Sequence, residues 1–92
     1  MPGRARTLRF HPLFRTEALA LRGTVDDFDG RLSRIMDVIH RFPEQAILDP
    51  WDNWSVYFGE QAGFPATIYY RFDDHRVEAM SIKSFPANRR RF

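Results

Sequence analysis

Cysteine is absent from this sequence. Its absence excludes a disulfide scaffold, a zinc–thiolate or iron–sulfur site and a cysteine nucleophile. It is compatible with a reducing compartment, and we expect a cytoplasmic protein. No apolar run approaches the roughly 18 residues that a membrane span needs, so no membrane association is expected. The basic residues up to Arg6 are not followed by the apolar stretch of a secretory signal.

Lysine is nearly absent as well, because Lys83 is the one lysine among 14 basic residues. The charges are also segregated along the chain. Residues 1–22 carry five arginines against Glu17, a net charge of +4, and residues 23–60 carry three arginines against eight acids, a net charge of −5. Residues 61–92 carry six basic residues against three acids, a net charge of +3. Arginine binds phosphate and carboxylate in a bidentate manner, so a nucleic acid or an acidic protein is one expected partner. GC-rich coding explains the same composition equally well.

The length of 92 residues predicts one domain, 1–92, with flexible ends at 1–5 and 88–92. Alternating apolar residues predict a strand over 6–11, which Pro12 ends. A run of strong helix formers predicts a short helix over 16–22 with Thr16 as its N-cap. A second helix is expected to follow a cap at Asp26 or Asp27 and to end before Pro43. Its apolar positions form a single stripe: Phe28, Leu32, Ile35, Met36 and Ile39.

The second half of the chain is read as a loop over 44–53 and strands over 54–58, 67–72 and 76–83. The predicted order is therefore β-α-α-β-β-β. The fold class is α+β, with two helices packed on one face of a four-stranded, mainly antiparallel sheet. We expect no helix on the opposite face of the sheet, which we call the open face, and we expect it to be the functional surface.

Alternation along the strands predicts which side chains share that open face. If Ile68, Tyr70 and Phe72 pack on the helices, then Tyr69 and Arg71 are exposed together. In the next strand Met80 and Ile82 are expected in the core, which places the intervening residues on the open face: Ala79, Ser81 and Lys83. A cation beside an exposed ring can hold a phosphate and stack a base. The alternative is that Tyr69 packs against its neighbours and that the arginines are solvated.

Other kinds of chemistry find little support in the residues. The three histidines, His11, His40 and His75, fall on different predicted elements without ligand spacing. Neither a glycine-rich phosphate loop nor a nucleophile elbow is present. We therefore expect no metal and no cofactor.

Residues 64–82, FPATIYYRFDDHRVEAMSI, resemble the signature hairpin of the RelE/ParE superfamily of bacterial toxins. In that family a Phe-Pro leads into a strand ending in Tyr-Arg, a turn of the Asp-Asp type follows, and a last strand leads to a basic C-terminus. The Phe10-His11-Pro12 end of the first strand and the second helix ending before Pro43 agree with the family pattern. The resemblance implies a toxin of a type II toxin–antitoxin pair, neutralised by an antitoxin.

The family contains two mechanisms. RelE-like members cleave mRNA on the ribosome without a metal, and ParE-like members bind DNA gyrase. For an endoribonuclease the resemblance implies that the catalytic residues are Arg71, Lys83 and Arg90. Binding roles are implied for Tyr69, Arg89 and Arg91.

Two departures from the pattern of cleaving members leave open whether the chain is an enzyme. Residues 51–54 hold none of the lysines, and residues 64–70 hold none of the arginines, that such members often carry there. These departures favour a gyrase-directed toxin. The alternatives are a ribosome-dependent endoribonuclease and a non-toxic binding protein on the same fold.

Overall fold

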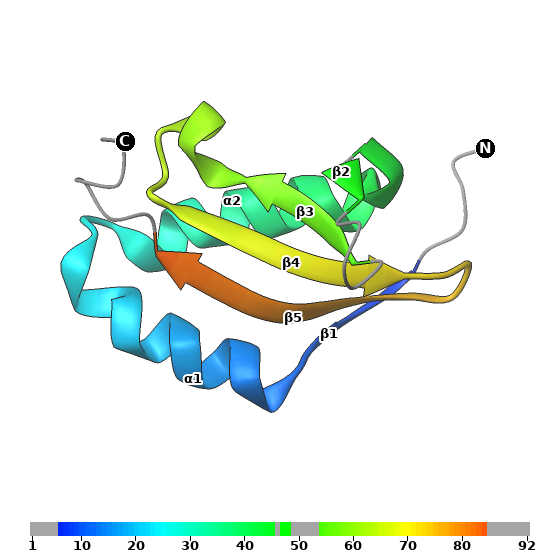
Figure 1. The fold of residues 1–92 in the computed structure, drawn as a ribbon, viewed down its shortest axis with the longest axis horizontal. Helices are drawn as coiled ribbons and strands as arrows, with labels where there is room; N and C mark the ends of the chain where they lie inside the picture. Colours follow the sequence, from blue (N-terminus) through cyan, green and yellow to red (C-terminus); the bar gives the residue numbers. More distant parts are fainter. Residues whose placement is uncertain (1–5, 46, 49–53, 85–92) are drawn as a thin grey trace.

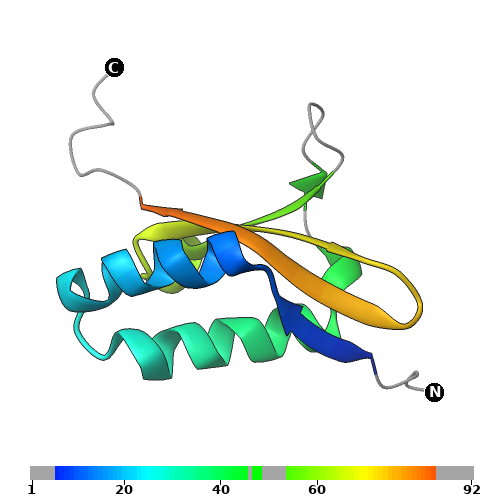
Figure 2. The same cartoon turned by 90° about the horizontal axis from the view of Figure 1, so that it is seen from below.

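The computed structural model describes residues 6–45, 47–48 and 54–84 (Figure 1). The elements are β1 (Thr7–Phe10), α1 (Pro12–Leu21), η1 (Arg22–Thr24), α2 (Phe28–Arg41), η2 (Pro43–Gln45), β2 (Ile47–Leu48), β3 (Ser55–Phe58), η3 (Gly59–Ala62), β4 (Ala66–Phe72) and β5 (Arg76–Ser84). Both α-helices lie on one side of the sheet, and the other side carries no helix of the described chain (Figure 2). The predicted α+β class, with two helices on one sheet face, is confirmed.

The sheet has five strands in the order β1-β5-β4-β3-β2. β1 pairs with β5 in parallel and every other neighbouring pair is antiparallel, so the sheet is mixed. The fifth strand, β2, lies in the stretch 44–53 that we predicted as loop. Ile47 of β2 pairs with Val56 and Leu48 with Ser55. A strand of two residues is too short to produce the alternation by which strands are recognised in a sequence.

Helix α1 begins at Pro12, four residues before the predicted N-cap at Thr16. The ring nitrogen Nδ1 of His11 accepts a hydrogen bond of 3.0 Å from the backbone N–H of Leu13, so His11 caps the helix. Pro12 ends the strand, as predicted, but it also starts the helix, because its fixed φ suits the first helical position and its missing N–H would have no helical partner there. Thr16 lies inside the helix and caps nothing.

Helix α2 confirms the predicted stripe. Phe28, Ile35, Met36 and Ile39 are buried, and Leu32 is half-buried against them. Asp27 occupies the N-cap position, as expected, but its side chain accepts no capping hydrogen bond. Its backbone is left-handed, with φ of 53°. No helix among the described residues is long and apolar enough to cross a membrane.

A β-bulge in β5 overturns part of the predicted face assignment. Tyr69 pairs with Ser81 but Tyr70 pairs with Ala79, which leaves Met80 as an extra residue without a partner in β4. The bulge reverses the alternation at this point, since one additional residue exchanges the two faces of a strand. Ala79, predicted on the open face, is therefore a core residue, and Met80 is buried outside the main core cluster.

Candidate functional site

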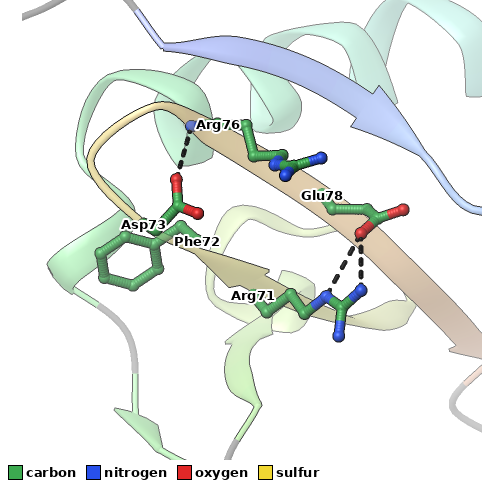
Figure 3. Close-up of a pocket in the computed structure, with 5 residues that line it drawn as sticks. All are labelled: Arg71, Phe72, Asp73, Arg76 and Glu78. Carbon is green, nitrogen blue, oxygen red and sulfur yellow. Dashed lines mark hydrogen bonds and ion pairs between the residues drawn. The ribbon is translucent and has the colours of Figure 1, made fainter.

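The hairpin end of the open face holds a small pocket of mixed charge. Its volume is about 280 Å³, and it is lined by Arg71, Phe72, Asp73, Arg76 and Glu78 (Figure 3). The pairing of β4 with β5 brings these side chains together, because Arg71 lies opposite Glu78 and the backbone N–H of Asp73 donates to the carbonyl oxygen of Arg76. Two of the four charged groups in the lining are acidic.

Arg71 is held by Glu78. Its Nε and Nη2 atoms donate hydrogen bonds of 3.2 and 3.0 Å to the same carboxylate oxygen, Oε1 of Glu78 (Figure 3). The Arg71 side chain is 59% exposed, whereas that of Glu78 is only 19% exposed. The guanidinium is thus oriented and its charge is compensated before any ligand arrives.

The β4–β5 turn is fixed by Asp73. Its Oδ1 accepts hydrogen bonds from the backbone N–H groups of His75 (2.7 Å) and Arg76 (2.9 Å). These two hydrogen bonds lower the pKa of the Asp73 carboxyl below its ordinary value. Nearby, the Nε of Arg6 donates to the Asp73 carbonyl oxygen, and the same guanidinium lies 5.6 Å from the centre of the Phe72 ring.

A second cluster lies at the opposite end of β5 and joins it to α1. The Oε1 atom of Glu17 accepts hydrogen bonds from the Ser81 hydroxyl (2.7 Å) and the Ile82 backbone N–H (3.0 Å). Its Oε2 atom accepts from the Lys83 ammonium group. Burial by itself raises the pKa of the Glu17 carboxyl, but the hydrogen bonds from Lys83, Ser81 and Ile82 outweigh it and leave the pKa below its ordinary value.

The predicted site residues are distributed over both ends of the sheet. Tyr69, which is half-buried, and Arg71 share the open face of β4, as expected. Lys83 lies opposite Thr67, four residues along β4 from Arg71, which corresponds to about 13 Å. Arg89, Arg90 and Arg91 lie outside the described residues. Within the described ranges, no group of three histidine or acidic side chains is arranged to hold a metal ion.

The sequence analysis did not identify the two carboxylates that bind Arg71 and Lys83. Glu78 could have been found, because a hairpin turning at residues 73–75 sets it opposite Arg71. Glu17 could not, since more than sixty residues separate it from Ser81 and Lys83 and nothing in the local sequence links them.

Comparison with known proteins gives a structural match without a sequence match. No family model and no curated protein matches the sequence. Among solved structures, a chain of the crystal structure of the E. coli DinJ-YafQ toxin-antitoxin complex superimposes with a TM-score of 0.67. The match covers 88% of this chain and 93% of that chain. The chain has the RelE/ParE fold. The sequence identity is 9%, so this likeness concerns the fold.

Proposed function

We propose that this chain is the toxin of a type II toxin–antitoxin pair, acts in the cytoplasm, and works by binding DNA gyrase rather than by cleaving RNA. The observation that carries the choice of mechanism is that the two predicted catalytic cations within the described residues, Arg71 and Lys83, are each bound by a carboxylate. Arg71 is bound by Glu78 and Lys83 by Glu17, about 13 Å apart along the sheet. A cleaving enzyme needs cations aimed together at one scissile phosphate, where negative charge develops.

The mixed charge of the hairpin pocket supports the same choice. The carboxylates of Asp73 and Glu78 lie beside the arginines of the pocket, and they repel the phosphates of a nucleic-acid backbone. A protein surface, in contrast, can offer both acidic and basic side chains to this pocket. The fold supports an antitoxin partner, because the similar solved chain comes from a toxin–antitoxin complex.

A groove between the two helices is where we propose that the antitoxin binds. Its volume is about 370 Å³, and Phe14, Leu19 and Leu32 are among its apolar lining residues. Leu19 is 66% exposed, and Arg15 lies on the same groove, whereas Arg22 is bound there by Asp29 at 2.7 Å. An amphipathic segment with an acidic flank would bury this apolar surface and pair with Arg15.

The test is induction of the gene alone in a bacterium, with growth, DNA-damage response and amino-acid incorporation followed together. We expect growth arrest with a DNA-damage response while protein synthesis initially continues. The purified protein is expected to inhibit supercoiling by gyrase. Unimpeded growth at high expression would contradict the toxin function and leave a binding protein on the same fold.

The endoribonuclease is the second candidate, favoured by the shared open face of Tyr69 and Arg71. It predicts arrest with an early fall in protein synthesis and cleaved mRNA. The variants Arg71→Ala and Lys83→Ala separate the mechanisms. If both variants leave arrest and translation unchanged, these residues do not catalyse RNA cleavage. Loss of mRNA cleavage in both variants would instead exclude the gyrase mechanism as the main one.

A further inference from the structure

Helix α1 covers a part of the β5 edge that β1 leaves open. β1 pairs with Arg76–Ala79 of β5, so no strand of the described residues lies beside the outer edge of β5 beyond Ala79. In Figure 1, α1 runs along this half of β5. Glu17, in the middle of α1, accepts the hydrogen bond of the edge amide of Ile82, a group that would otherwise be free to pair with another strand.

The same carboxylate binds the one lysine of the chain. Glu17 is the single acid among residues 1–22, and Lys83 is the single lysine among all 92 residues. The Glu17 side chain is 17% exposed, while that of Lys83 is 59% exposed. The acid is therefore fixed by Ser81 and Ile82, and the lysine is the member of the pair that solvent and ligands can reach.

We infer that Glu17 is a fixed counter-ion that withholds the Lys83 ammonium group from anionic ligands at the C-terminal end of β5. The inference deepens the proposed function, which itself rests on Lys83 being bound by Glu17. Glu17 acts through Lys83 and is a positioning residue. Its carboxylate is anchored by two further hydrogen bonds, so an incoming phosphate must compete with a carboxylate that is already in place.

The first test is the rate at which Lys83 is acetylated by an N-hydroxysuccinimide ester of acetic acid, measured by mass spectrometry of the peptide that contains it. In Glu17→Gln the amide oxygen still accepts from Ser81 and Ile82, but the amide nitrogen cannot accept from Lys83. We expect about fivefold faster acetylation in Glu17→Gln, the factor that corresponds to an ion pair of about 1 kcal/mol. Equal rates in the wild type and Glu17→Gln would overturn the inference.

Two further variants accompany this comparison, one as a control and one as a replacement. Glu60→Gln makes the same charge change at an exposed acid in η3 and should leave the rate at the wild-type value. If circular dichroism shows that Glu17→Gln does not fold, Glu17→Asp replaces it. Its carboxylate is one methylene shorter and withdraws from Lys83, so acetylation should again be faster than in the wild type.

The second test measures the affinity for a short fluorescein-labelled single-stranded RNA by anisotropy. In the wild type, Lys83→Ala should change the affinity less than about twofold, because Lys83 is already bound. Glu17→Gln should bind about fivefold more tightly, and Lys83→Ala in that background should remove the gain. An equal loss in both backgrounds, or no binding by Glu17→Gln, would overturn the inference. Neither assay depends on toxicity, so failure here and failure of the growth experiment are distinguishable.

Discussion

The hydroxyl of Tyr70 donates a hydrogen bond of 2.6 Å to the carbonyl oxygen of Pro43. Tyr70 is 1% exposed in the middle of β4, and Pro43 is buried directly after α2. This contact joins the backbone just beyond the C-terminal end of α2 to the sheet. The ring of Tyr70 thus packs in the core, while its hydroxyl satisfies a backbone carbonyl there.

Tyr70→Phe is expected to destabilise the protein by about 1–2 kcal/mol, because it leaves the Pro43 carbonyl without its partner inside the core. Urea unfolding at pH 7 measures this difference. Tyr57→Phe provides a control, since the half-buried Tyr57 packs against the core and its hydroxyl has no hydrogen-bond partner among the described residues. An equal effect in both variants would contradict the role of the Pro43 contact.

The stability of the wild type is expected to fall at alkaline pH because of the same residue. Burial, followed by the nearby negative charge of Glu44, raises the pKa of Tyr70 from 10.0 to about 12. The unfolded chain therefore releases the proton first, and the contribution that is complete below pH 10 is lost as the pH rises towards 12. Urea midpoints across this range should decline less in Tyr70→Phe than in the wild type.

Glu17→Ala is expected to destabilise the protein by about 1–3 kcal/mol at pH 7, since it removes three hydrogen bonds between α1 and β5. The pKa of Glu17 is lower in the folded state than in the unfolded chain, so its contribution is present above pH 4.5 and is lost as the pH falls through the folded value. The gap between the urea midpoints of wild type and variant should narrow as the pH falls below 4.5. A gap that does not depend on pH would show that the charge of Glu17 contributes nothing.

The core stripe of α2 predicts a matched pair of substitutions. Ile35 is 5% exposed, and Ile35→Ala should lower the free energy of unfolding by about 2–4 kcal/mol through lost burial and a cavity. Val38 on the same helix is 43% exposed, and Val38→Ala should change it by less than about 1 kcal/mol. A reversed order would mean that α2 buries a different face.

Gly59 and Gly23 form a second matched pair. A Cβ added at Gly59 would collide with the backbone carbonyl oxygens of Ala66 and Phe64, whereas at Gly23 it would meet nothing within 4 Å. Backbone cannot yield as a flexible side chain can, so Gly59→Ala should be destabilising by about 1–3 kcal/mol and Gly23→Ala close to neutral. Thermal unfolding distinguishes the two variants. Equal melting temperatures would contradict the close approach at Gly59.

The sequence predicts those elements whose signal is local and repeated. The stripe of α2 is one such signal, because Phe28, Ile35 and Ile39 repeat with the helical period. The bulge at Met80 is not local, since the extra residue exists only relative to β4. The cap at His11 was missed because histidine is not among the preferred capping residues.

The candidate site shows the same division. That Tyr69 and Arg71 share a face follows from strand alternation alone. That Arg71 and Lys83 are each bound by a carboxylate depends on side chains brought together by the fold, from β5 and from α1. The sequence shows which positions carry cations, but only the tertiary structure shows which carboxylate binds each of them.

The pairing of β1 with β5 has a consequence for synthesis of the chain. Thr7, near the start, pairs with Arg76, so the first strand has no place in the sheet until the last strand has emerged from the ribosome. α1 also docks against β5, and until then it exposes Phe14, which is 2% exposed in the folded protein. Until β5 has been synthesised, the apolar side of the α1 segment therefore lacks the strand that covers it, and aggregation competes with folding during that period. Premature termination before residue 76 would leave β1 and α1 without the strand against which both pack.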